Sequence, residues 1–245
     1  MKSVLITGAN RSIGLETAKQ LSAKGLFVYL GSRNLEKGEA IVNGLHLQGY
    51  ENIKAIAIDV TNPESILVAK NSIEKEQGKL DILINNAGIL GDNPQTAAET
   101  PVENIQDVFN TNFFGVISVT QAFLDLLKNS DSPRISNITS GLGSLTLHND
   151  PSWDYYHVKT AAYGPSKAAL NAYTIVLAYE LKDLPFKVNV IDPGYTATDF
   201  NQHSGSGSVE SAASFIVKHT LTNESGATGK FFSNDIKDES GISPW

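Results

Sequence analysis

The sequence predicts an α/β fold, with one doubly wound parallel sheet of about seven strands and helices on both faces. Short apolar runs alternate with segments whose apolar residues recur at helical spacing, and glycine, asparagine or aspartate follows several of the runs. The chain has 245 residues, of which 41% are hydrophobic, so it can bury one sizeable core. We therefore expect a single domain over residues 1–245.

The first predicted strand, residues 4–6, leads into a glycine turn at 7–14, and a helical pattern then continues to Gly25. A turn of this kind brings main-chain N–H groups and a helix N-terminus against a pyrophosphate. Its spacing differs from the plain G-x-G-x-x-G fingerprint. A tight strand-to-helix turn without a ligand is the alternative interpretation.

Three further predicted strands follow, at 26–30, 53–58 and 80–84, with a predicted helix at 35–47. Asp59 follows the third strand, where it could accept a hydrogen bond from an adenine amino group or cap the helix that begins after Asn62 and Pro63. The fourth strand ends in Asn-Asn-Ala-Gly at 85–88. These small, polar residues let main chain lie along a cofactor, or form an ordinary turn.

In the second half, the pattern of one long helix covers residues 102–127 and contains Asn110, Asn112 and Gly115. These residue types weaken a helix interior, so we expect a bend or an internal water site there. Later strands are predicted at 135–139, after Arg134, and at 187–191 and 230–232, and a Gly/Ser-rich stretch at 204–208 precedes a helix to Val217. The order of elements is that of a Rossmann-type architecture.

Tyr163 and Lys167 lie four residues apart, so on a helix they share a face, where the ammonium can favour the ionised phenol. A helix that begins at Tyr163 has Pro165 in its first turn, where proline is tolerated. Apolar residues then continue at helical spacing to Leu181. We interpret Tyr163 and Lys167 as an acid–base pair.

Two other tyrosines have a lysine at the same spacing. Tyr50 lies beside a strand-like run, where an offset of four residues separates side chains by roughly 13 Å. Tyr155 with Lys159 is the stronger competitor. A helix that carried this pair onward would have to pass through Gly164 and Pro165, and proline removes a main-chain hydrogen bond there. The position of Pro165 therefore favours Tyr163 over Tyr155.

Composition limits the class of protein. The formal net charge is −7 and the lysines are scattered, which argues against nucleic acid or an anionic membrane as partner. The chain has no cysteine, hence no disulfide or thiolate metal site, and we predict no metal. Met1 leads directly into a strand-like run, and no apolar segment approaches the length of a membrane span. We expect a soluble, cytoplasmic protein.

Taken together, these motifs resemble the short-chain dehydrogenase/reductase family over residues 4 to about 232. The 7–14 turn is similar to the family's cofactor turn, residues 85–88 to its Asn-Asn-Ala-Gly segment, and 193–198 to the segment that holds the nicotinamide carboxamide. The resemblance implies a catalytic tetrad of Asn112, Ser140, Tyr163 and Lys167. Thr139 and Ser144 are neighbouring hydroxyls that could be mistaken for Ser140.

The resemblance also implies a role for each residue. Tyr163 would exchange a proton with the carbonyl oxygen, Ser140 would hydrogen-bond that oxygen, and Lys167 would lower the Tyr163 pKa and hold the nicotinamide ribose. Asn112 would position a water that relays protons, unless it serves only as a bend. The implied cofactor-binding residues are Gly8, Asn10, Arg11, Ser12, Ile13, Gly14, Arg33, Asp59, Val60, Asn86, Ala87, Gly88, Tyr163, Lys167, Pro193, Gly194, Thr196 and Thr198.

This sequence departs from the family pattern in two places. Ser12 stands where glycine or alanine is usual, and the span from Ser140 to Tyr163 is longer than the common spacing. The longer span resembles the carbonyl-reductase-like branch. We expect the insertion 141–162, which is rich in apolar and aromatic residues, to wall a pocket for a hydrophobic carbonyl substrate, with a subunit contact as the alternative. We expect 196–220 to form a lid.

The arginines suggest which cofactor is used. Arg11 and Arg33 fall at turns that border the adenosine ribose in this architecture, where an NAD-specific site has an acidic residue. A guanidinium can grip a 2′-phosphate, so we predict NADPH, with NADH as the alternative, unless both arginines are simply solvated. Glu36 is the nearest carboxylate, and we place it one turn into the following helix.

The sequence therefore predicts an oxidoreductase, namely an NADPH-dependent carbonyl reductase that acts on a hydrophobic ketone or aldehyde. The alternatives are an NAD-dependent alcohol dehydrogenase on the same scaffold and a protein that senses the dinucleotide without turnover. The expected partner is a small-molecule carbonyl substrate. A homo-oligomer is compatible with the resemblance, since the family includes monomers, dimers and tetramers.

Overall fold

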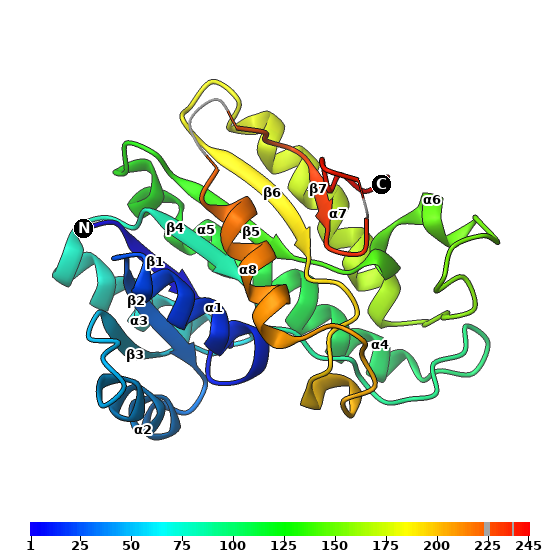
Figure 1. Cartoon of the computed structure of the whole chain (residues 1–245), viewed down its shortest axis with the longest axis horizontal. Helices are drawn as coiled ribbons and strands as arrows, with labels where there is room; N and C mark the ends of the chain where they lie inside the picture. The colour runs from blue at the N-terminus through cyan, green and yellow to red at the C-terminus, as the bar shows by residue number, and fades with distance from the viewer. Residues whose placement is uncertain (223–225, 237) are drawn as a thin grey trace.

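The computed structural model describes residues 1–222, 226–236 and 238–245. Seven parallel strands form one sheet in the order β3-β2-β1-β4-β5-β6-β7 (Figure 1). The strands are β1 (Ser3–Ile6), β2 (Phe27–Ser32), β3 (Ile53–Ala57), β4 (Ile82–Asn85), β5 (Arg134–Ile138), β6 (Lys187–Asp192) and β7 (Phe231–Ser233). This is the doubly wound Rossmann-like fold that the sequence predicts, and the predicted strands lie within a few residues of the observed ones.

Helices cover both faces of the sheet (Figure 1). Helices α1 (Ser12–Ala23), α2 (Leu35–His46) and α8 (Val209–Thr220) pack on one face, and α3 (Pro63–Gln77), α5 (Gly115–Lys128) and α7 (Tyr163–Glu180) on the other. The remaining helices are α4 (Val102–Phe109) and the short α6 (Leu145–His148). Their apolar stripes bury two separate cores, one on each side of the strands, as the spacing of apolar residues requires.

One local expectation is met, and one of the two alternatives for Asp59 is excluded. The helical pattern over 102–127 is interrupted by a turn of π-helix at Asn110–Phe114, which is the predicted irregularity. Asn62 caps α3 by accepting from the main-chain N–H groups of Glu64 and Ser65. Asp59 does not cap this helix. Its carboxylate accepts instead from the main chain and hydroxyl of Thr61, because it closes its own short turn first.

The predicted lid, residues 196–220, divides into two parts. Residues 209–220 form α8, whose Ala212, Ala213 and Ile216 are fully buried, so this half belongs to the core and is not part of a lid. Only residues 196–208 lie beyond the carboxyl end of β6. Across the described residues, no helix combines the length and apolarity that a membrane crossing needs.

Candidate active site

The carboxyl ends of β1 and β4 are tied together by side chains. Thr7 Oγ1 accepts from the main-chain N–H groups of Asn86 and Ala87, each at 3.0 Å. The Asn86 amide donates back to the main-chain oxygens of Thr7 and Gly8. The glycine turn and the Asn-Asn-Ala-Gly segment therefore form one rigid surface at the edge where ligands bind in this architecture.

The start of α1 has the features that an anionic ligand requires. No side chain caps this helix and its first turn has no acidic residue, whereas side chains cap α2, α3 and α8. Its first N–H groups are therefore free to bind a phosphate. A Cβ at Gly14 would lie 2.6 Å from Asn86 Nδ2, so only glycine allows this approach. Ser12 has φ 48°, which explains why glycine is the easier residue there.

Apart from Tyr163 and Lys167 on α7, the predicted cofactor-binding residues follow the carboxyl ends of strands. Gly8, Asn10, Arg11, Ser12, Ile13 and Gly14 follow β1, Arg33 follows β2, Asp59 and Val60 follow β3, Asn86, Ala87 and Gly88 follow β4, and Pro193, Gly194, Thr196 and Thr198 follow β6. The Val60 side chain does not face this edge. It is buried, and a Cβ at Gly115 would lie 2.9 Å from Val60 Cγ2, so only its main chain is available to a ligand.

The two arginines next to the predicted ribose position are exposed. The side chains of Arg11 and Arg33 make no hydrogen bond or ion pair within the described part of the chain, so both guanidinium groups are available to a ligand. Glu36 lies in the first turn of α2, not one turn further as expected, because the helix already begins at Leu35 after its cap, Asn34.

Helix α7 begins at Tyr163, as predicted, with Pro165 in its first turn. Lys167 is buried, and its Nζ donates to the main-chain oxygen of Ile138 at 2.8 Å. The same Nζ lies 5.6 Å from the centroid of the Tyr163 ring. A Cβ at Gly88 would lie 3.7 Å from Lys167 Nζ, so the Asn-Asn-Ala-Gly segment runs beside this pair.

The pKa of Tyr163 depends on its burial and on the groups near it. Burial raises the pKa of the phenol, the negative charge of Asp192 raises it further, and a hydrogen bond with Ser140 lowers it. Burial lowers the pKa of Lys167 to about 8, while Asp192 acts in the opposite direction. In this structure the cost of burying the phenolate dominates the shift of the Tyr163 pKa, and the expected lowering by Lys167 stays a prediction. At neutral pH Tyr163 carries its proton.

Ser140 is distinguished from the hydroxyls beside it by its contacts. Its own hydroxyl accepts from the main-chain N–H of Leu142 at 3.2 Å and bonds with Tyr163. Thr139 is buried and donates to Asn171 Oδ1 at 2.7 Å. Ser144 is buried too; it donates to the main-chain oxygen of Pro244 and caps α6. Of these three hydroxyls, Ser140 is the one that meets Tyr163.

Asn112 lies in the π-helical turn and is completely buried. Its Oδ1 accepts from the main-chain N–H of Ile89, and its Nδ2 donates to the oxygen of Ile89 and to Ser166 Oγ. Ser166 in turn donates to the main-chain oxygen of Tyr163. Asn112 therefore connects the segment after β4 to the first turn of α7, and π turns of this kind are frequent at functional sites.

Gln95, a residue that the sequence does not single out, caps the start of α7. The N-cap position, Ala162, has no capping side chain. Instead Gln95 Oε1 accepts from the main-chain N–H groups of Ala162 and Tyr163, at 3.0 and 3.1 Å, while its Nε2 donates to the oxygen of Leu90. Gln95 is a long way off in the sequence and carries no capping motif, so no local signal identifies it.

An aromatic series connects the insertion to the segment after β6. The Tyr155 ring lies 5.6 Å from the rings of both Trp153 and Tyr195, and Phe200 lies 5.5 Å from the Tyr163 ring. Tyr155 is not paired with Lys159, because 155–159 is not helical and Lys159 Nζ donates to the main-chain oxygen of His148. The predicted pairing over this stretch is thus excluded.

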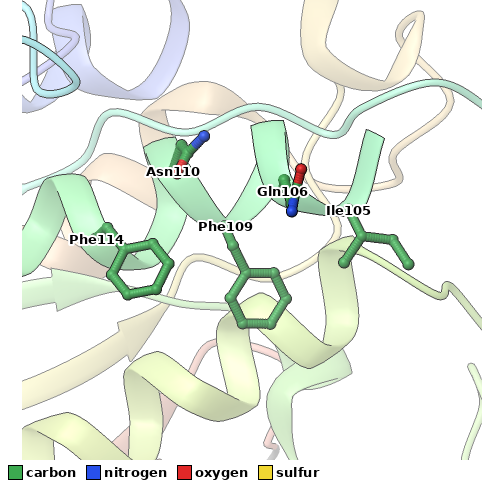
Figure 2. A pocket seen from close by; sticks show the side chains of 5 residues that line it. All are labelled: Ile105, Gln106, Phe109, Asn110 and Phe114. Carbon is green, nitrogen blue, oxygen red and sulfur yellow. The ribbon is translucent and has the colours of Figure 1, made fainter. Parts of the chain in front are cut away.

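A surface hollow of about 390 Å³ lies elsewhere, on the outer side of α4 and the π turn. Figure 2 shows Phe109 and Phe114 side by side there, with Ile105 next along the helix. None of the predicted tetrad residues lines it, since Asn112 points inward from the same turn. This hollow is therefore not the place where Ser140 and Tyr163 would meet a substrate.

A glycine turn leading to an uncapped helix, together with a tyrosine and a buried lysine at the same edge of the sheet, is typical of nicotinamide-dependent oxidoreductases of the doubly wound class. Residues 2–208 match the family model for short chain dehydrogenase, and the chain belongs to that family. Its members are oxidoreductases that act on CH–OH or C=O groups and use NAD(P)(H).

Similar proteins include a short-chain dehydrogenase, anuI, of Penicillium roqueforti (strain FM164), which is 36% identical over 96% of this chain and 94% of its own length. Among solved structures, salutaridine reductase from Papaver somniferum has a TM-score of 0.82 at 30% identity, over 96% of this chain and 100% of that one. An NADPH-bound carbonyl reductase from chicken fatty liver has a TM-score of 0.85 at 26% identity, covering 100% and 99% of the two chains.

Proposed function

We propose that this protein is an NADPH-dependent carbonyl reductase that acts on a hydrophobic ketone or aldehyde. The observation that carries the proposal is the meeting of Ser140 with Tyr163 one helical turn from the buried Lys167. When bound, the nicotinamide supplies the hydride that reduces the carbonyl carbon. The relatives that are named as reductases support the direction of the reaction.

In this proposal the chain's residues handle the oxygen atom of the substrate. Tyr163 holds its proton at neutral pH, as a general acid must, and donates it to the oxygen as the carbonyl is reduced. Ser140 donates a hydrogen bond to the same oxygen and stabilises the charge that develops on it. The Lys167 ammonium stabilises the tyrosinate that forms, and Asn112 provides the route by which the proton is replaced from solvent.

The aromatic series Trp153, Tyr155 and Tyr195, together with Phe200, walls the substrate side of Tyr163 in this proposal. The walls come from two segments, the insertion 141–162 and the 196–208 part of the predicted lid. Rings on both sides favour an apolar substrate with a flat or cyclic body, because aromatic walls stabilise ligands by burial and edge contacts.

Arg11 and Arg33 support NADPH over NADH, since both guanidinium groups are exposed beside the expected ribose position. A charge-assisted bond contributes roughly 1.5–3 kcal/mol, so losing one should cost about ten- to a hundredfold in NADPH efficiency. We expect Arg33→Asp to lower kcat/KM for NADPH by this factor and to leave NADH use similar or better. Lys24→Asp, which makes the same charge change at the end of α1, should leave the ratio of the two efficiencies unchanged.

The assay uses purified protein, a panel of apolar ketones and aldehydes, and both cofactors. NADPH oxidation that depends on the ketone would support the proposal. Wild-type protein that used NADH ten times more efficiently than NADPH would favour an NAD-dependent alcohol dehydrogenase. Dinucleotide binding without turnover of any carbonyl or alcohol would favour a sensing protein.

A further inference from the structure

We propose that Asp192 is a positioning residue for the proposed reductase reaction: its buried carboxylate fixes the Ser140–Gly141 turn and, when ionised, places a negative charge near Lys167 and Tyr163. Asp192 is the last residue of β6 and is 3% exposed. It comes just before Pro193 and Gly194, and its neighbour in the sheet, β5, ends just before Ser140. The inference rests on the proposed function, because positioning has meaning only for a reaction at Tyr163.

The carboxylate joins three segments that are far apart in the sequence. Asp192 Oδ1 accepts from the main-chain N–H of Gly194 at 3.0 Å, and Oδ2 accepts from Ser233 Oγ at 2.7 Å. The main-chain N–H of Gly141 donates a third hydrogen bond. Gly141 directly follows Ser140, so the hydrogen bond to Asp192 fixes the turn that orients the Ser140 hydroxyl.

The hydrogen-bond donors around position 192 explain why this residue is an aspartate. The Gly194 and Gly141 main chain can only donate to the Asp192 side chain, and a carboxylate is a group with acceptors alone. Asparagine at the same position would turn an NH₂ group toward at least one of these N–H donors. A Cβ at Gly141 would lie 3.5 Å from Asp192 Oδ2 and 3.2 Å from the Trp153 ring, so the turn is packed closely between the two.

Charged and titratable groups face Asp192 from every element around it. Lys167 and Tyr163 on α7 feel its charge, as does Tyr155 in the insertion, and Asp235 after β7 acts on it in turn. Asp154 acts on Asp235 and on Tyr155. No lysine or arginine of the described chain forms an ion pair with Asp192. Lys167 is the cationic group whose pKa responds to the charge of Asp192.

The consequence is a coupled titration at the site. Burial raises the pKa of Asp192 to about 7, with Asp235 adding to the rise, against hydrogen bonds from Ser233, Gly194 and Gly141. While ionised, Asp192 raises the pKa of Lys167 and so extends the pH range over which the ammonium keeps its charge. Asp192 therefore acts through Lys167 and Ser140, without contacting the substrate.

The test compares Asp192→Asn with Asp81→Asn, a matched change of a buried aspartate at the opposite edge of the sheet. The first readout is the side-chain NMR titration of Lys167 in the protein alone, with the signal assigned as the one missing from Lys167→Met. We expect the Lys167 midpoint to move to lower pH in Asp192→Asn and to stay in place in Asp81→Asn. An unchanged midpoint in folded Asp192→Asn would overturn the inference.

A second readout is the pH profile of kcat/KM for ketone reduction with NADPH. Asp192→Asn should lower the maximum by about tenfold, the loss expected from one charge-assisted contact, and move the alkaline limb to lower pH. If Asp192→Asn does not fold, Asp235→Asn takes its place, because Asp235 is exposed and its charge raises the Asp192 pKa. The Asp192 carboxyl signal should then titrate at lower pH, and an unmoved carboxyl signal would overturn the coupling.

The two proposals fail in different ways. Wild-type protein that reduces no carbonyl would refute the proposed function, and the NMR titration of Lys167 would still decide whether Asp192 sets its charge. Active wild-type protein with a Lys167 midpoint unaffected by Asp192→Asn would refute the role of Asp192 alone.

Discussion

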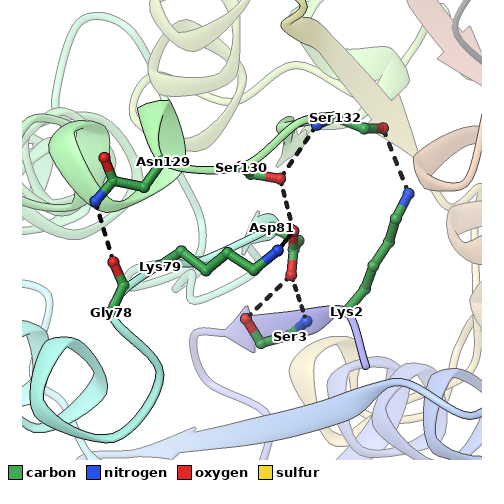
Figure 3. A network of polar contacts seen from close by, with 8 residues as sticks. All are labelled: Lys2, Ser3, Gly78, Lys79, Asp81, Asn129, Ser130 and Ser132. Carbon is green, nitrogen blue, oxygen red and sulfur yellow. Dashed lines mark hydrogen bonds and ion pairs between the residues drawn. The ribbon is translucent and has the colours of Figure 1, made fainter.

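Two buried aspartates, at opposite edges of the sheet, show how differently this fold treats the same side chain. Asp81 precedes β4 at the amino edge, where it accepts from the main-chain N–H of Ser3 at 2.8 Å and from Ser130 Oγ at 2.6 Å, and pairs with Lys79 at 3.2 Å (Figure 3). Asp192 ends β6 at the carboxyl edge without such an ion pair among the described residues.

The pKa shifts of the two aspartates follow from these partners. Burial alone would raise the pKa of Asp81, but the bonds from Ser130, Ser3 and Lys79 outweigh it and hold the pKa below its ordinary value. Burial raises the pKa of Asp192 to about 7. At the amino edge, hydrogen bonds and an ion pair outweigh the cost of burying the Asp81 carboxylate, which holds strands together. At the carboxyl edge, where the reaction is expected, the partners of the Asp192 carboxylate do not outweigh that cost.

The largest expected effect is on turnover, and it comes from a substitution at the carboxyl edge of the sheet. Tyr163→Phe should lower kcat by roughly 10²–10⁴-fold, the usual contribution of a general acid, while dinucleotide binding survives. Tyr155→Phe should mainly change KM, because Tyr155 lies in the aromatic wall. Steady-state kinetics with an apolar ketone and fluorescence titration with NADPH provide the measurements. If Tyr163→Phe kept a tenth of wild-type turnover and Tyr155→Phe did not, the two tyrosines would have to exchange roles.

A second difference concerns the pH dependence of activity. Lys167 has a pKa of about 8, so its charge, and with it the stabilised tyrosinate, is lost as the pH rises through that value. Reduction efficiency should fall by about tenfold per pH unit above it. Asp81→Asn, at the far edge, should show the same profile as wild type when kcat/KM is measured between pH 6 and 10. A profile that stayed flat to pH 10 would contradict the assignment of Lys167.

The amino edge should show its effect in stability. Asp81→Asn should lower the free energy of unfolding by about 1–3 kcal/mol at neutral pH, because buried donors lose their charged partner. The folded-state pKa of Asp81 is depressed, so its contribution is present above the unfolded value of about 3.9 and is lost as the pH falls through the folded pKa. Urea denaturation at pH 7 and pH 3 should therefore give a smaller gap between wild type and variant at pH 3.

Stability should depend on pH with the opposite slope at Asp192. Its folded-state pKa of about 7 exceeds the unfolded value of about 3.9, so between these values the folded protein holds a proton that the unfolded chain releases. The wild type should therefore lose stability relative to Asp192→Asn as the pH rises from 4 to 7. The same denaturation series measures this difference in the free energy of unfolding. A wild type that instead gained stability relative to Asp192→Asn as the pH rises would show that the partners of Asp192 outweigh the cost of its burial.

Much of the fold could be predicted because its signals are local. Alternating apolar runs fix the strands, and Pro165 fixes where α7 begins, since proline fits only the first turn. The tetrad residues could be named from motifs, and the structure brings Ser140 to Tyr163. Val60 was named as a cofactor-binding residue; its side chain packs into the core against Gly115, so a contact through its main chain stays a prediction.

What could not be predicted depends on contacts between distant segments or on burial. Asp192 reads as a turn residue before proline, and nothing in its neighbourhood reveals that Ser233 and Gly141 donate to it. The charge state of Tyr163 depends on how much water is excluded around the phenol, which spacing along a helix does not report. The predicted lid extended too far because it included the helix expected after residue 208, and only the burial of that helix in the structure shows that α8 belongs to the core.

The cap that Gln95 places on α7 has a consequence for how the enzyme assembles. The bond from Ala162 to Gln95 spans 67 residues of chain, so the first turn of α7 gains its acceptor only after the segment that follows β4 has docked. Contacts of such long sequence separation form late, since closing the loop costs entropy before the contact returns any. The body of α7 can therefore form early, while the turn that carries Tyr163 is completed near the end of folding. If Tyr163 is the proton donor, a partly folded chain that already has most of its helices would still be inactive.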